Sequence, residues 1–170
     1  MSKNENLEIL KVINDYDKAL SLLDNYDHQC LNKPNGVKDS YKITYEECRN
    51  IIDSMKFDSN IFGVERDGSF NSSINAIYQT AFGEEVYKSN LEKAANLLYF
   101  VVKNHSFVDG NKRIAASIFI YFLYKNNLLY KNGIKVISDS ALVTIIIIIA
   151  VSKPEEKDTM IKLIMNFLSI

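Results

Sequence analysis

The chain has 170 residues, 47% of them hydrophobic and 24% charged, which fits one domain with a sizeable core. The formal net charge of −1 predicts no broad basic face, so we expect no nucleic-acid partner. Cys30 and Cys48 show neither metal-ligand spacing nor a disulfide framework, and no apolar segment of a signal peptide follows the polar start. We therefore expect the protein to lie in the cytoplasm, which is a reducing environment.

The N-terminal third predicts two helices. Residues 4–24 carry apolar side chains at helical spacing over one long amphipathic stretch. A second helix is predicted from Thr44 to Met55, because Thr44 and Glu47 have capping-box spacing. We expect residues 1–56 to form a helical segment packed on a core of residues 57–170. The alternative is an arm that packs on another protein.

A turn region follows this segment. Residues 57–70 have no helical period, and Asp67-Gly68 is a tight-turn signal between short mixed stretches. A small β-hairpin is predicted here, with an ordinary surface turn as the alternative. A further helix is predicted over residues 72–82, ending before Gly83.

The next elements are helices on either side of a short polar stretch. Residues 91–104 have helical apolar spacing, and residues 114–124 are apolar nearly all round, as in a buried helix. The remainder predicts a turn at Asn132-Gly133 and helices over residues 140–151 and 154–167. The apolar run 145–151 is too short to cross a bilayer, so we expect no membrane partner. The fold class is all-α with small hairpins.

The stretch from His105 to Arg113 concentrates the chemistry. It reads His-Ser-Phe-Val-Asp-Gly-Asn-Lys-Arg. It lies between the helices predicted over residues 91–104 and 114–124, at the N-terminus of the latter. A helix N-terminus attracts anions, and Lys112 and Arg113 add positive charge, so phosphate is the expected ligand. Asp109 beside a polyphosphate suits Mg²⁺, which takes one or two carboxylates together with phosphate oxygens.

This stretch resembles the signature of the Fic/Doc (Fido) family, His-x-Phe-x-(Asp/Glu)-Gly-Asn-(Gly/Lys)-Arg, with every fixed position filled. The resemblance is strongest over residues 69–168. With Lys112 at the eighth position, the chain looks most like the bacterial branch that includes the death-on-curing toxins. The resemblance implies a Fic-type helical bundle with a β-hairpin flap before the motif, and ATP and Mg²⁺ as cosubstrate and cofactor.

The family resemblance also implies roles at the two ends of the loop. His105 would be the general base that takes the proton from a Ser, Thr or Tyr hydroxyl of a target protein. The alternative for His105 is a helix C-cap. Asp109 would be the magnesium ligand, with a helix N-cap as the alternative.

The remaining motif residues would hold the nucleotide. Gly110, Asn111, Lys112 and Arg113 are implied as ligands of the phosphates, and Arg113 also as a stabiliser of charge in the transfer. The alternatives are a tight turn and solvated charges. Phe107 is expected to anchor the loop in the core. The implied target-binding flap, which would add the target segment as a strand, comprises Val64, Glu65, Arg66, Asp67, Gly68, Ser69, Phe70 and Asn71.

Two departures leave the transferred group open. Family members that transfer AMP often have Gly where this chain has Lys112 and a second Arg where it has Ala116. The toxins that carry the lysine transfer the γ-phosphate instead, yet they typically have Ala where this chain has Gly110. AMP transfer is the preferred interpretation, because Gly110 and Asn111 keep the anion nest. Phosphate transfer by a kinase and a catalytically silent nucleotide-binding module are the alternatives.

The sequence contains no complete copy of the inhibitory motif that many members of the family carry in their own chain. Many family members carry (Ser/Thr)-x-x-x-Glu-(Gly/Asn), but Glu84 and Glu156 are followed here by Glu and Lys. We expect control in trans, from an antitoxin-like partner or from homo-oligomerisation.

Overall fold

The computed structural model describes residues 2–55 and 57–169 of the chain. The helices are α1 (Lys3–Asn14), α2 (Asp17–Asp27), α3 (Tyr45–Ser54), α4 (Ser69–Ala76), α5 (Asn90–Asn104), α6 (Asn111–Lys125), α7 (Asp139–Val151) and α8 (Lys157–Phe167), with a 3₁₀ turn η1 (Pro154–Glu156) before α8. The strands are β1 (Thr80–Ala81), β2 (Glu84–Glu85), β3 (Tyr130–Lys131) and β4 (Ile134–Lys135). The predicted mostly helical fold with small hairpins is confirmed.

The chain divides into two compact units, one ending at Asn32 and one spanning residues 33–169. The first unit holds α1 and α2, where a single helix over residues 4–24 was predicted. That prediction is wrong, because α1 ends at Asn14 and α2 begins at Asp17. Asn and Asp side chains compete for backbone hydrogen bonds and favour helix ends. The predicted packing of residues 1–56 on the core stays a prediction, and residue 56 lies outside the described residues.

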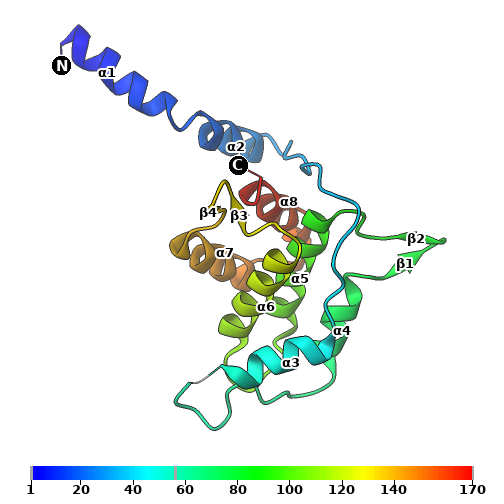
Figure 1. Ribbon diagram of the computed structural model, residues 1–170. Coiled ribbons are helices and arrows are strands. Elements are labelled where there is room, and N and C mark those ends of the chain that lie inside the picture. Colours follow the sequence, from blue (N-terminus) through cyan, green and yellow to red (C-terminus); the bar gives the residue numbers. More distant parts are fainter. Residues whose placement is uncertain (1, 56, 170) are drawn as a thin grey trace. The chain divides into compact units, whose positions relative to one another are not determined.

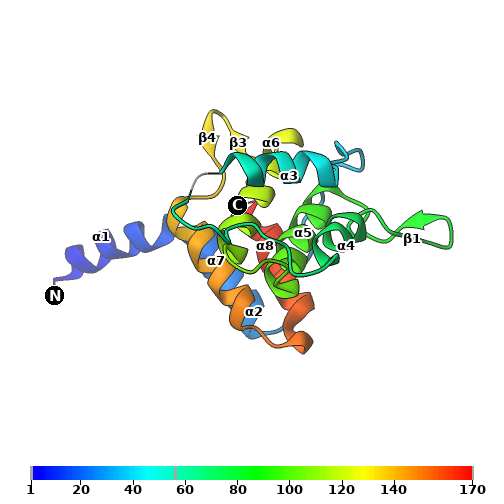
Figure 2. The same cartoon turned by 90° about the horizontal axis from the view of Figure 1, so that it is seen from below.

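The second unit is built around α5. This helix packs against α4, α6, α7 and α8, and α3 packs against α6. Figures 1 and 2 show α5 at the centre of these helices. Eleven of its 15 residues are buried. The loop at its C-terminal end is therefore carried by the most enclosed helix of the unit.

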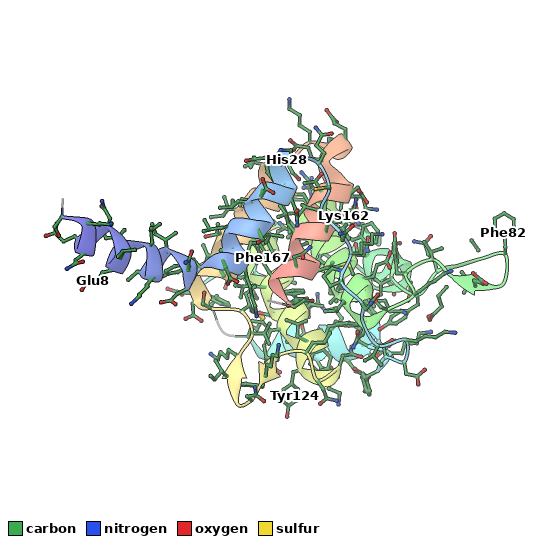
Figure 3. The ribbon with its side chains drawn as sticks, turned by 90° about the horizontal axis from the view of Figure 1, so that it is seen from above. Glu8, His28, Phe82, Tyr124, Lys162 and Phe167 are labelled. Carbon is green, nitrogen blue, oxygen red and sulfur yellow. The ribbon has the colours of Figure 1, made fainter. Side chains whose placement is uncertain are left out.

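Two hairpins project from the helices of the second unit. β3 and β4 pair around Asn132-Gly133, as predicted. β1 and β2 pair around Phe82-Gly83, where a helix over residues 72–82 was expected. That helix is instead α4, which begins and ends earlier. Figure 3 shows Phe82 at the tip of its hairpin, away from the helices.

The hairpin predicted over residues 57–70 does not form. Asp67 accepts a hydrogen bond from the Ser69 amide at 2.9 Å, and Gly68 is the N-cap of α4. The turn signal therefore starts a helix. Phe62 and Glu65, which lie in this region, bridge to residues of the loop between α5 and α6.

The apolar run 145–151 lies in α7. Ile145, Ile146 and Ile149 are buried, so one face of the helix belongs to the core. Ile147 and Val151 are exposed. Across the described residues, no helix combines the length and the apolar character that a membrane span requires.

Candidate functional site

The loop between α5 and α6 is anchored in the core by Phe107. This side chain is fully buried, and its ring packs edge-on against Phe70 with a centroid distance of 4.8 Å. Next to it, Ser106 is buried and its hydroxyl lies 2.5 Å from that of Ser69. The prediction that Phe107 anchors the loop in the core is confirmed. The anchored ring thereby fixes the loop, whose His105 is exposed and whose Asp109 is half-buried.

Asn111 braces the loop from the first turn of α6. Its Oδ1 accepts from the Phe107 amide at 2.9 Å, and its Nδ2 donates to the Phe107 carbonyl at 2.8 Å. This pair of bonds determines which end of the amide is the donor. The same Nδ2 lies 3.4 Å from Nε2 of His105, a longer and weaker contact. The side chain of Asn111, a residue expected to bind phosphate, therefore braces the loop next to the histidine.

His105 ends α5 in the left-handed conformation, with φ of 48° and ψ of 53°. This backbone turn brings the chain out of the helix and leaves the imidazole exposed. Its Nδ1 lies 3.4 Å from Nη1 of Arg66. His105 is thus the C-cap residue of α5, which was the alternative prediction for it. Its imidazole is also an accessible group in the site.

Residues 63–66 run beside the loop and pair with it along the backbone. The Gly63 amide donates to the Asp109 carbonyl at 3.1 Å, the Val108 amide donates to the Val64 carbonyl at 2.8 Å, and the Arg66 amide donates to the Ser106 carbonyl at 2.8 Å. These hydrogen bonds resemble those between β-strands. They form two isolated β-bridges, Phe62 with Asp109 and Glu65 with Phe107, and no continuous ladder. The first part of the expected flap thus lines the outer side of the loop.

α3 fixes this segment from the other side. Arg49 donates to the Gly63 carbonyl at 2.9 Å and lies 3.4 Å from the Glu65 carboxylate. The Tyr45 hydroxyl donates to the same carboxylate at 2.5 Å, and this hydrogen bond raises the pKa of Tyr45. Of the expected flap residues, Ser69, Phe70 and Asn71 lie in α4 instead.

Gly110 is required by its surroundings. Its φ is +92°, and a Cβ built on it would lie 2.3 Å from Cε2 of Phe62. Real Cβ atoms do not approach that closely, and the positive φ adds strain for any L side chain. Phe62 therefore accounts for glycine at this position.

The N-terminus of α6 has no side-chain cap. Within the described part of the chain, no hydrogen bond is made by the backbone N–H groups of Asn111, Lys112 and Arg113, while the Ile114 amide bonds to the Gly110 carbonyl. Free N–H groups at the positive end of a helix dipole form a site for an anion.

Asp109 and Arg113 pair across one turn. Nη2 of Arg113 lies 3.2 Å and 3.3 Å from the two carboxylate oxygens. The guanidinium also stacks near the rings of Phe57 and Phe62, at 4.3 Å and 4.8 Å from their centroids. The two rings come from outside the motif and were not expected. No local pattern could have identified them, because their contact with Arg113 is a tertiary one.

The residues predicted for catalysis, phosphate binding and metal binding meet in one cavity of about 280 Å³, which Val108 also lines, whereas none of the expected flap residues lines it. The predicted residues in the cavity are His105, Asp109, Gly110, Asn111, Lys112 and Arg113. Among the described residues, no group of three or more His, Cys, Asp or Glu side chains could hold a metal ion by itself. A cation at Asp109 would need oxygens from a ligand, which fits Mg²⁺ bound together with phosphates.

The two glutamates considered for inhibition have local partners. Glu84 lies 3.1 Å from the Lys88 ammonium, and Glu156 accepts from the Lys153 amide at 2.7 Å. Ser152 donates to the Ile149 carbonyl at the end of α7. The carboxylate on Arg113 is that of Asp109, from the motif itself.

Cys48 is not part of this chemistry. Burial raises the pKa of its thiol to about 12, so it stays protonated and unreactive at neutral pH.

Comparison with known proteins gives one match. The model of the Fic/DOC family matches residues 34–123, which includes α3 to α5, the loop and most of α6. No curated protein and no solved structure matches the chain significantly.

Proposed function

Because the chain belongs to the Fic/DOC family, we propose that it is a transferase that uses ATP and Mg²⁺ to modify a hydroxyl side chain of a target protein. The observation that carries the proposal is the cavity that joins an exposed histidine, a carboxylate and the uncapped N-terminus of α6. A base beside an anion site is what attack of a hydroxyl on phosphorus requires.

In the proposed reaction, His105 takes the proton of the target hydroxyl. The hydroxyl oxygen forms a bond to the α-phosphorus of ATP while the bond from that phosphorus to the bridging oxygen breaks. The products are an AMP ester on the target and pyrophosphate. The free N–H groups of residues 111–113 would hold phosphate oxygens, because they have no other acceptor in the described residues.

Asp109 and Arg113 would change partners when the nucleotide binds. Mg²⁺ would supply positive charge that offsets the charge of the phosphates, and Asp109 is the carboxylate that suits it. Arg113 would then turn from Asp109 to a phosphate oxygen. The pair is partly exposed, so breaking it costs little, about 1 kcal/mol or less.

AMP transfer is favoured by Gly110. Phe62 leaves no space for the alanine found at this position in the death-on-curing toxins. The anion nest around Gly110 therefore keeps the form found in the wider family. We propose on this ground that the chain transfers AMP, although Lys112 places it near the toxin branch.

The rival proposal is a kinase that transfers the γ-phosphate, acting as the toxin of a toxin–antitoxin pair. Lys112 is the observation in its favour. This side chain is exposed, lines the cavity and has no ion-pair partner among the described residues. Its bulk and charge would alter how a polyphosphate lies in the cavity.

The test is a labelling experiment with purified protein, Mg²⁺ and a bacterial lysate. Parallel reactions contain ATP labelled at the α- or the γ-phosphate, and each is repeated with His105→Ala. Label from the α position alone supports AMP transfer, whereas label from the γ position alone supports the kinase. Transfer that survives His105→Ala contradicts the assigned base. If ATP protects the protein from thermal unfolding and nothing is labelled with any target tested, a silent binding module is favoured.

A further inference from the structure

The three arginines of the chain all lie at or beside the site, and they differ in their partners. Arg49 pairs with Asp53 and Glu65, and Arg113 pairs with Asp109. Arg66 has no carboxylate within ion-pair distance in residues 2–55 and 57–169. Its only side-chain hydrogen-bond contact there is the one with His105, at 3.4 Å.

The histidine ring lies between two donors. A guanidinium can only donate, and the Nδ2 of Asn111 is held as a donor by its bonds to Phe107. A neutral imidazole has one acceptor nitrogen, so the ring can satisfy one of these two groups. Asn111 is buried and fixed, whereas Arg66 is exposed. Arg66 is therefore the donor left available for another acceptor.

The contact between Arg66 and His105 is also weak. A distance of 3.4 Å exceeds the usual range of N–H donor bonds, so it exchanges readily for a shorter bond to a phosphate oxygen. A guanidinium forms paired bonds with phosphate, and such charge-assisted bonds are stronger than those between neutral groups.

The backbone of Arg66 is held in place beside the base. Its amide donates to the Ser106 carbonyl at 2.8 Å, one residue from His105. The preceding residue, Glu65, is fixed by Tyr45 and Arg49 on α3. The side chain thus starts from a fixed point next to the histidine, although it belongs to a different segment of the chain.

We propose that Arg66 binds the phosphate group whose phosphorus is attacked by the hydroxyl that His105 deprotonates. The inference rests on the proposed function. It adds to the site a cation from outside the motif, on the side of the base opposite Asn111. An acidic side chain of the target protein is the other anion that Arg66 could meet, and the experiment separates the two.

The experiment measures the binding of AMP, ADP and ATP, each with Mg²⁺, by calorimetry. The variants are Arg66→Ala and Arg66→Lys. Lys88→Ala is the control, because it also removes one exposed positive charge but lies before the N-terminus of α5, away from the loop. Thermal unfolding of each variant checks the fold.

Arg66→Ala should weaken ATP binding by about tenfold to a hundredfold, the usual effect of losing a charged hydrogen bond. Arg66→Lys should recover part of the loss, and Lys88→Ala should bind as the wild type does. If the α-phosphate lies beside His105, the three nucleotides lose affinity by the same factor. If the γ-phosphate lies there, ATP alone is affected.

Equal binding of all nucleotides to wild type and Arg66→Ala would overturn the inference and favour a contact with the target protein. Wild-type protein that binds none of the nucleotides would instead contradict the proposed function. The two failures are therefore distinguished by the behaviour of the wild type alone.

Discussion

α5 and α6 are both 15-residue helices, yet their N-termini are built differently. At α5 every early amide has an acceptor. Asn90 donates to the Val37 carbonyl, Leu91 to the Asn90 side chain, and Glu92 to the Ser89 hydroxyl. At α6 the corresponding amides of residues 111–113 have none in the described part of the chain.

The difference is what we expect if the N-terminus of α5 serves stability and the N-terminus of α6 serves the proposed binding of phosphate. Three amides without acceptors would be costly if they were buried, so they have to face water or a ligand. At α6 the three residues that carry them line the cavity beside His105. Asn111, a residue type that often caps helices, directs its side chain back to Phe107 instead of capping α6.

Among the variants that test this comparison, Gly110→Ala should have the largest effect on the free energy of unfolding. The added methyl group would meet Phe62, and alanine is strained at a φ of +92°. We expect the free energy of unfolding to fall by about 3 kcal/mol, measured by urea denaturation. Phe62→Ala in the same chain should offset part of this loss, about 1 kcal/mol, by removing the clash. Strictly additive effects in the double variant would show that Phe62 is not the obstacle.

Asn111→Ala should have the next largest effect. It removes the partners of the Phe107 amide and carbonyl inside the loop, which should lower the free energy of unfolding by about 2 kcal/mol. Asn104→Ala is the matched control at the other end of the loop, because it loses one bond from an exposed residue. Equal destabilisation by both variants would argue against a special bracing role for Asn111.

Ser89→Ala is expected to affect stability alone. It removes the side-chain cap of α5, which should cost about 1 kcal/mol in the free energy of unfolding. Nucleotide affinity, measured by calorimetry, should not change, since Ser89 and the loop lie at opposite ends of α5. A measurable loss of nucleotide affinity in the folded variant would mean that the two ends of α5 are coupled.

The smallest effects should come from Glu84→Gly and Glu156→Gly. Both carboxylates are engaged locally, with Lys88 and with the Lys153 amide, so neither restrains Arg113. Target labelling should stay at the wild-type level in both variants. A wild type that is inert and a variant that is active would instead reveal inhibition in cis.

Local patterns sufficed to predict the central helices and the loop. The apolar period defined α5 within one residue, and the chemistry of His105 to Arg113 identified the residues that line the cavity. These features depend on neighbours in sequence. The same is true of the hairpin at Asn132-Gly133.

Features that depend on distant partners were missed. Asp67-Gly68 was interpreted as a hairpin turn, because the sequence does not show that residues 62–66 pair with a loop that lies 40 to 47 positions away. The packing of Phe62 on Gly110 and of Phe57 on Arg113 is likewise tertiary. Only the folded chain shows that a second segment completes the site.

The most direct test of this account is to follow the backbone amides by ¹⁵N NMR while ATP and Mg²⁺ are added. The open N-terminus of α6 predicts that the largest shifts occur at Asn111, Lys112 and Arg113, while Asn90, Leu91 and Glu92 of α5 stay unchanged. Saturable binding that leaves the three α6 amides unmoved would contradict the claim that this helix end holds the phosphates.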